Sequence, residues 1–256
     1  MRREPASLRR FAALVATLAL LWLAAASPIL AATPIARLDL PWWRARLARK
    51  AEELRQTPVD LVFYGDSITE DFERTGPEPW RNFAPVWRRY YGTRHAVNLG
   101  FKGDTTANLL WRVMHGEANG IAPKVAVVLI GANNLGRLHW SAEDTLVGIA
   151  ADITALRQRL PKTRILLLGI LPSARSAWAD ETTRAVNRGL AERYRAAPMV
   201  TFLDISAIFM KNGALDRTLF LDPLLTPPEP PLHPNAEGQA KMAAAIEPAL
   251  ARLLGE

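Results

Sequence analysis

Four polar segments of this chain carry the residue types that acyl-transfer chemistry needs. They offer a hydroxyl, a glycine backbone N–H, a carboxamide and an imidazole, on Ser67, Gly103, Asn133 and His233. A serine hydroxyl can attack a carbonyl carbon when an adjacent imidazole takes its proton, and two hydrogen-bond donors stabilise the oxyanion that forms. A glycine suits one donor position because it lets a substrate approach the backbone closely. These residue types therefore indicate a nucleophile and base beside an oxyanion hole.

Each of these residues also has a purely structural role open to it. The sequence Gly65-Asp66-Ser67 is common at strand-to-turn junctions, and Asp66 is better suited to fixing that turn than to the chemistry. The glycine at 103 could belong to a turn and helix cap, and Asn133 and Asn134 could be turn residues. We interpret the remaining histidines as surface or loop residues, namely His95, His115 and His139.

Five short apolar runs bounded by turn formers predict five β-strands, at 59–64, 96–99, 125–130, 165–170 and 200–203. Segments with helical spacing of apolar residues precede, separate and follow them, at about 35–56, 104–113, 141–160, 182–195 and 235–254. Strands that alternate with helices favour a parallel sheet covered on both faces. The expected fold is a single-domain three-layer α/β/α sandwich of the flavodoxin-like kind, with strand order 2-1-3-4-5.

The strand ends bring the four polar segments together. Ser67 follows the first strand, Gly103 the second and Asn133 the third. The carboxyl ends of parallel strands meet at one edge of the sheet, where ligand crevices form. His233 lies in the proline-rich loop between the fifth strand and the last helix, and it can reach the same edge. We therefore expect one site rather than four unrelated turns.

The amino-terminal segment predicts export. A positive region formed by Arg2, Arg3, Arg9 and Arg10 precedes the apolar run 11–26, and small residues follow at 24–26 and 31–32. This is the pattern of a signal peptide, which we place at residues 1–32, with the mature domain at 33–256. An uncleaved anchor is the alternative, although the run is short for a membrane span. The expected location is periplasmic or secreted.

Composition excludes several classes of function. The sequence has no cysteine, so thiolate catalysis, disulfides, cysteine-bound zinc and a lipoprotein anchor are excluded. The net charge of +7 is inflated by the amino-terminal arginines, and no arginine run is interleaved with aromatic residues, so a nucleic-acid partner is not indicated. No cluster of ligands suggests a metal, and no cofactor is expected.

Four sequence blocks resemble those of the SGNH (GDSL) hydrolase family. They are Gly65-Asp-Ser-Ile-Thr69, Gly103-Asp-Thr-Thr106, Gly131-Ala-Asn133 and Leu232-His-Pro-Asn235. Within that family, the stretch 98–106 and the flanking residues 110–112, 116–117, 123–125 and 168–172 resemble the catalytic subunits of platelet-activating-factor acetylhydrolase. The resemblance implies Ser67 as nucleophile, His233 as base, and an oxyanion hole formed by the N–H groups of Ser67 and Gly103 with the Asn133 side chain.

One position departs from the family pattern. The family places an aspartate three residues before the histidine, where this chain has Pro230. Proline cannot orient an imidazole, and removing the orienting carboxylate of a serine protease lowers kcat roughly 10⁴-fold. We expect Glu229, one position earlier, to take this role through its longer side chain. Asp222 folding back across the loop is the first alternative, and a Ser-His dyad or an inactive site is the second.

The sequence as a whole predicts an exported serine esterase that hydrolyses short-chain, by resemblance acetyl, esters. Its substrate would be a small ester, a lipid or an O-acetylated glycan. Two other classes stay open. An O-acyltransferase would form the same acyl-enzyme and pass the acyl group to a sugar hydroxyl. A non-catalytic binding protein of the cell envelope is plausible only because of Pro230.

Overall fold

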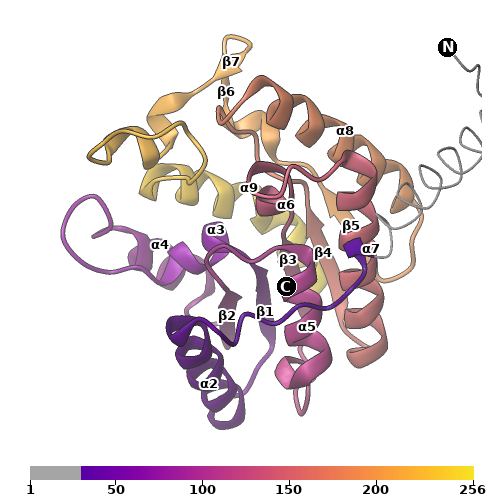
Figure 1. The fold of residues 1–256 in the computed structure, drawn as a ribbon. Helices are drawn as coiled ribbons and strands as arrows, with labels where there is room; N and C mark the ends of the chain where they lie inside the picture. The colour runs from indigo at the N-terminus through magenta and orange to yellow at the C-terminus, as the bar shows by residue number, and fades with distance from the viewer. Residues whose placement is uncertain (1–29) are drawn as a thin grey trace, which may run out of the picture.

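A parallel sheet of five strands lies between two layers of helices in the computed structural model, which describes residues 30–256 (Figure 1). The strand order β2-β1-β3-β4-β5 confirms the expected 2-1-3-4-5 arrangement. Most of the predicted signal peptide lies outside the described residues. The strands are β1 (Leu61–Gly65), β2 (Ala96–Gly100), β3 (Val125–Leu129), β4 (Arg164–Leu168) and β5 (Val200–Leu203).

Several of the helices begin at residues whose side chains cap them. Thr105 forms a capping box with Asn108, and the side chains of Ser141 and Asn235 accept hydrogen bonds from Asp144 N and Gly238 N. None of the helices described between residues 30 and 256 combines the length and apolar character that a membrane span requires. The helices are α2 (Pro41–Gln56), α3 (Ser67–Glu70), α4 (Phe83–Tyr91), α5 (Thr106–Arg112), α6 (Ala132–Gly136), α7 (Ala142–Arg159), α8 (Ala177–Arg193) and α9 (Ala236–Leu254).

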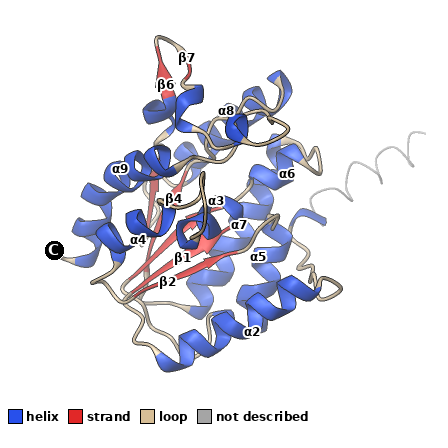
Figure 2. Cartoon of the chain, turned by 90° about the vertical axis from the view of Figure 1, so that its left-hand side faces the viewer, coloured by secondary structure: helices blue, strands red, loops and turns tan. Residues whose placement is uncertain are grey.

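The core has two halves, one on each face of the sheet. Side chains alternate along β1, so Val62 and Tyr64 point to one face and Leu61 and Phe63 to the other. The first face is covered by α5, α7 and α8, and the second by α4 and α9 (Figure 2). Every residue of β1 is buried. This central strand is therefore held from both sides, and its carboxyl end gives rigid support to the turn after Gly65.

The register of the sheet places three chain segments level at one edge. Gly65 at the end of β1 pairs with Gly100 at the end of β2 and with Leu129 at the end of β3. The segments that continue from these residues leave the sheet together. The elements that were not expected from the sequence include helix α4, the short helix α6, and a hairpin of β6 (Met210–Lys211) and β7 (Ala214–Leu215).

Candidate active site

A cavity of about 770 Å³ opens at the carboxyl edge of the sheet. Ser67, Gly103, Asn133 and His233 all line it. Four residues from four separate segments, chosen on sequence grounds, therefore meet at one place. Asp222, Glu229 and Pro230 also line this cavity, so the residues that bear on the orientation of His233 can be compared directly.

The turn at Gly65 aims Ser67 into the cavity. A Cβ atom at Gly65 would lie 2.1 Å from Thr69 Oγ1 and 2.6 Å from Leu129 O, so only glycine fits where β1 turns into α3. Asp66 caps this helix, because its Oδ1 accepts a hydrogen bond from Ile68 N at 3.0 Å. The expected turn-fixing role of Asp66 is confirmed. Ser67 becomes the first residue of α3, with its hydroxyl at the cavity wall.

A chain of hydrogen bonds links Ser67 to a buried carboxylate. Ser67 Oγ lies 3.0 Å from His233 Nε2, and His233 Nδ1 lies 2.6 Å from Asp222 Oδ1. The second oxygen of Asp222 accepts the backbone N–H groups of Leu232 and His233 at 2.7 and 2.6 Å. Because a carboxylate only accepts, Nδ1 carries the proton and Nε2 presents its lone pair to the serine hydroxyl.

The residue that contacts the imidazole is Asp222, and the preference for Glu229 was wrong. Glu229 is exposed, and its backbone N–H donates to Asp222 O at 3.0 Å. The physical reason is an antiparallel bridge between Phe220 and Pro234, which lays the segment before Asp222 beside the segment that holds His233. The N–H of Leu221 donates to His233 O at 2.8 Å within this pairing. The bridge brings Asp222 next to His233, so Asp222 supplies the carboxylate that is missing at position 230.

The electrostatics of this pair keep the carboxylate charged. Burial raises the pKa of Asp222, but the hydrogen bond and charge of His233 outweigh it, and the pKa lies below its ordinary value. Burial lowers the pKa of His233, whereas the hydrogen bond and charge of Asp222 raise it, with a net rise above the ordinary 6.5. Asp66 behaves differently, because its burial raises the pKa to about 7.

Gly103 and Asn133 line the same cavity as Ser67. Gly103 has φ of +75°, a left-handed conformation that favours glycine, and a Cβ there would lie 2.6 Å from Arg137 Nη1. The amide of Asn133 is held by a hydrogen bond from Nδ2 to Asp104 O at 3.0 Å. Asn134 is structural instead, since its side chain binds the backbone and hydroxyl of Thr106 at 3.1 and 2.7 Å.

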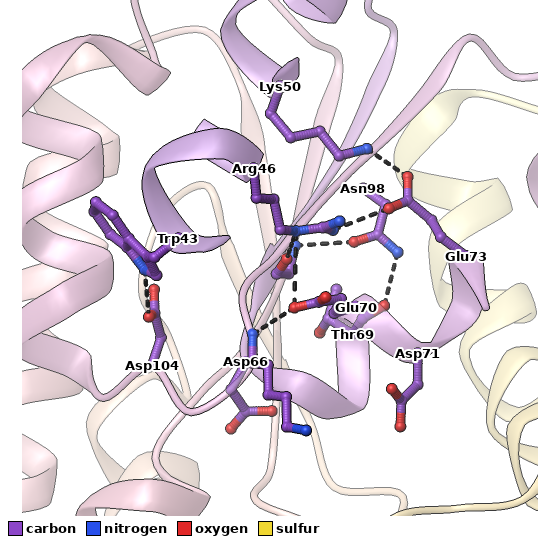
Figure 3. A network of polar contacts seen from close by, with 12 residues as sticks. Trp43, Arg46, Lys50, Asp66, Thr69, Glu70, Asp71, Glu73, Asn98 and Asp104 are labelled. Atoms are coloured by element: carbon purple, nitrogen blue, oxygen red, sulfur yellow. Dashed lines mark hydrogen bonds and ion pairs between the residues drawn. The ribbon is translucent and has the colours of Figure 1, made fainter. Parts of the chain in front are cut away.

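A polar network on α2 braces the serine turn from outside, and sequence reasoning missed it (Figure 3). Arg46 Nε donates to Gly100 O at 2.7 Å, and its Nη2 donates to Glu73 Oε2 at 2.9 Å. Lys50 adds ion pairs to Glu53 and Glu73. Both cations are at least nine-tenths buried. The sequence signal that could have revealed it is their spacing, because Arg46 and Lys50 lie on the same face of α2 as its buried apolar residues.

A third buried cation, Arg112, holds the backbone after Gly103. The guanidinium of Arg112 binds Asp104 Oδ2 at 2.9 Å and Glu117, and it lies 4.1 Å from the ring centre of Phe101. Trp43 Nε1 donates to the other oxygen of Asp104 at 2.9 Å. Asp104 is thus tied on both oxygens, which restrains its neighbour Gly103.

The remaining histidines differ in their relation to the cavity. His95 and His115 are exposed and lie outside the cavity, as expected. His139 is exposed too, but it lines the cavity and packs 5.0 Å from the ring of Trp178. Within residues 30–256, no three His, Cys, Asp or Glu side chains gather in a way that could hold a metal ion.

Similar proteins place this geometry in a known family. Residues 63–241 match the model of the GDSL-like Lipase/Acylhydrolase family. The platelet-activating factor acetylhydrolase IB subunit alpha1 of Bos taurus is 30% identical over 217 residues, covering 83% of this chain and 84% of the relative. A solved GDSL-like lipase from Bacteroides thetaiotaomicron has a TM-score of 0.60 at 22% identity, covering 81% of this chain and 98% of its own.

A carbohydrate esterase of family 3 from Talaromyces cellulolyticus has the same fold, with a TM-score of 0.57 at 19% identity and coverage of 77% of this chain and 98% of its own. The family match spans the segments that carry Ser67, Gly103 and Asn133, and it ends beyond His233. The chain belongs to the GDSL-like lipase/acylhydrolase family and is a carboxylic ester hydrolase.

Proposed function

We propose that the protein hydrolyses short-chain acyl esters through an acyl-enzyme on Ser67. The observation that carries this proposal is the hydrogen-bonded series Ser67–His233–Asp222, with distances of 3.0 and 2.6 Å, at the wall of the cavity. Ser67 Oγ attacks the acyl carbon while His233 Nε2 takes its proton. The imidazolium then protonates the departing alcohol, and a water activated by the same nitrogen releases the acid. Asp222 holds the required tautomer and stabilises the imidazolium.

The oxyanion formed in each half-reaction is bound by three donors in this proposal. They are the backbone N–H groups of Ser67 and Gly103 and the Nδ2 group of Asn133. The N–H of Ser67 lies in the first turn of α3, where such groups have no partner within the helix. Gly103 has no side chain of its own to shield its N–H, and its left-handed conformation favours glycine. Fixed donors of this kind stabilise charge without reorganising during the reaction.

Covalent labelling of Ser67 tests the mechanism directly. A fluorophosphonate probe should label the folded protein once, and peptide mass spectrometry should locate the adduct on Ser67. Ser67→Ala should abolish both labelling and ester hydrolysis while the thermal unfolding curve stays near that of the wild type. Labelling that persists in the alanine variant would assign the nucleophile to another residue.

Acetyl is the acyl group that we propose, and hydrolysis is the reaction. Support comes from the relative named as a platelet-activating factor acetylhydrolase subunit and from the presence of a carbohydrate esterase among similar structures. Rates on p-nitrophenyl esters of increasing chain length should fall beyond the shortest members. Product analysis with a polysaccharide acceptor present distinguishes hydrolysis from O-acyl transfer, since transfer would leave acetylated acceptor. The non-catalytic alternative loses its basis, because Asp222 replaces the acid that Pro230 displaced.

Export is the location that we propose for this enzyme. It rests on the arginine-rich start followed by the apolar run 11–26 and small residues. Cell fractionation of the full-length chain, with mass determination of the mature amino terminus, tests it. A chain that retains residues 1–32 in a soluble cytoplasmic fraction would contradict it.

A further inference from the structure

The cavity above Ser67 has an excess of cationic side chains. Four cations and two carboxylates line it: Arg37, Lys102, Arg137 and Arg175, with Asp222 and Glu229. Arg37 is already paired with Asp104 at 3.1 Å, and Asp222 is engaged by His233 at 2.6 Å. The charge that remains on the wall is therefore mainly positive, and it is not explained by the chemistry of the ester bond.

Two of these cations are attached to the segments that supply the oxyanion donors. Arg137 Nη1 donates to Gly103 O at 3.1 Å, and Arg175 Nη1 donates to Ala132 O at 3.3 Å. The guanidinium of Arg175 also packs on Gly136, where an added Cβ would lie 1.9 Å from Nη1. Each guanidinium has five N–H donors, and a single backbone carbonyl uses only one of them. Among residues 30–256, neither group takes part in an ion pair.

The environment of Arg175 favours an anion beside it. Burial lowers the pKa of this guanidinium and the like charge of Arg137 adds to that, while the carboxyl groups of Asp66 and Asp222 act in the opposite direction. An arginine still carries its charge at neutral pH. Arg175 is only partly buried, but it makes no ion pair among the described residues, and a bound anion would offset the free-energy cost of that partial burial. Glu229, the remaining carboxylate, is exposed to solvent and also acts to raise the pKa of Arg175.

We propose that Arg137 and Arg175 form a subsite for an anionic group, a carboxylate or a phosphate, on the alcohol part of the ester. A guanidinium fork matches both groups in geometry and charge. The acyl part is short in the proposed function, on which this inference rests, so the charged group belongs to the leaving alcohol. The ring of Trp42, which is 42% exposed and lines the same cavity, offers an apolar wall for the body of that alcohol.

Matched pairs of esters test the subsite. The acetyl ester 3-acetoxybenzoate carries a carboxylate on its leaving group, and 3-acetoxybenzamide has nearly the same shape without the charge. The ratio of their kcat/KM values in the wild type should fall roughly tenfold in Arg137→Gln and in Arg175→Gln, the loss expected for one hydrogen bond between charged groups. The kcat/KM value of 3-acetoxyphenyl phosphate, compared with that of 3-acetoxybenzoate, shows whether the subsite prefers a phosphate or a carboxylate. Arg252→Gln, an exposed position on α9 outside the cavity, makes the same change in net charge and should keep the wild-type ratio.

The possible results distinguish three cases: an anion subsite, guanidinium groups that act on the oxyanion, and a protein that does not hydrolyse esters. An unchanged ratio in both variants overturns the proposal, and so does an equal slowing of both esters, which would place the guanidinium groups on the oxyanion. Calorimetric binding of 3-hydroxybenzoate should weaken roughly tenfold in the same variants, a readout that needs no turnover. If no ester is hydrolysed but this binding difference is found, the subsite stands and the proposed reaction fails. Arg137→Lys and Arg175→Lys should recover part of the preference.

Discussion

Asp222 is the residue whose position changes the interpretation of the site most. Sequence patterns relate His233 to its immediate neighbours, and the position three residues before it is Pro230. The contact that forms instead joins residues 11 apart in the chain, through a backbone bridge between Phe220 and Pro234. Local spacing offers such a contact only as an alternative and cannot favour it, because it depends on how the loop between the two segments closes. Ser67, Gly103 and Asn133 were foreseeable because each directly follows a strand whose end is fixed by the sheet.

The first prediction concerns the pH profile of Asp222→Asn. His233 must be neutral to accept a proton, and its pKa is raised partly by Asp222, so kcat/KM of the wild type should fall as pH drops through this raised pKa. Without the carboxylate charge the pKa falls, and the acid limb of the profile should move to lower pH. The plateau should drop by roughly 10³ to 10⁴-fold, because the tautomer is no longer enforced.

Glu229→Gln is the matched control for that experiment. It removes one carboxylate from the same cavity without touching the bond to His233. The acid limb should stay where the wild type has it. The comparison is made between variants because Asp66, with a pKa of about 7, also titrates near neutral pH. A profile that shifts in Glu229→Gln but not in Asp222→Asn would return the orienting role to Glu229.

At the scale of elements, apolar patterning predicted the sheet and its helices well. Strands β1 to β4 are almost wholly buried, the edge strand β5 is partly so, and each long helix has an apolar face, so these elements leave a signal in the sequence. Helix α6 leaves no periodic apolar signal, since its five residues make little more than one turn and two of them are asparagine. The role of α2 was hidden for another reason. Its buried positions include cations, Arg46 and Lys50, whose partners lie on α3, the following 3₁₀ turn and the end of β2.

The second prediction concerns this brace. Arg46→Met removes the donor to Gly100 O and the pair with Glu73, so the free energy of unfolding should fall by about 1–3 kcal/mol. Gly100 ends the strand that leads to Gly103, so the oxyanion donors lose support and kcat should fall more than KM rises. Denaturant unfolding and steady-state kinetics below the melting range measure the two effects.

Arg55→Met provides the control on the same helix. Arg55 is 67% exposed and pairs with Glu52 at the surface, where ion pairs contribute about 0–1 kcal/mol. Its loss should leave both stability and kcat near wild type. An Arg46→Met enzyme that is less stable but has wild-type kcat when folded would limit α2 to a structural role.

At the scale of the whole molecule, the active site carries a free-energy cost that depends on pH. Asp66 is buried, and its pKa is about 7 in the folded protein against an ordinary value of 3.8. Between these two values the unfolded chain loses the proton while the folded chain keeps it. The folded state then binds more protons, so stability must fall as pH rises through this range. Each unit of difference corresponds to about 1.4 kcal/mol, which sets an upper bound on the order of 4 kcal/mol.

The third prediction follows from this fall in stability with rising pH. Asp66→Asn keeps an oxygen that can accept from Ile68 N but has no charge to bury. The variant should be more stable than the wild type at pH 8 by a few kcal/mol, and the difference should shrink toward pH 4. Urea unfolding at several pH values measures it. Parallel curves for the two proteins would show that Asp66 is already ionised in the folded state at low pH.

The bridge between Phe220 and Pro234 separates the catalytic pair from the chain that connects it. Asp222 and His233 are clamped by backbone pairing on one side, while the intervening loop supplies Glu229, Pro230 and Leu232 to the mouth of the cavity. Lengthening a loop with fixed ends costs little, about 0.6 kcal/mol for each doubling. Apart from Glu229 and Leu232, whose N–H groups bond to Asp222, the loop can therefore change in length and sequence at low cost. Substitutions in the loop can therefore change which alcohol the cavity accepts while Ser67, His233 and Asp222 keep their geometry.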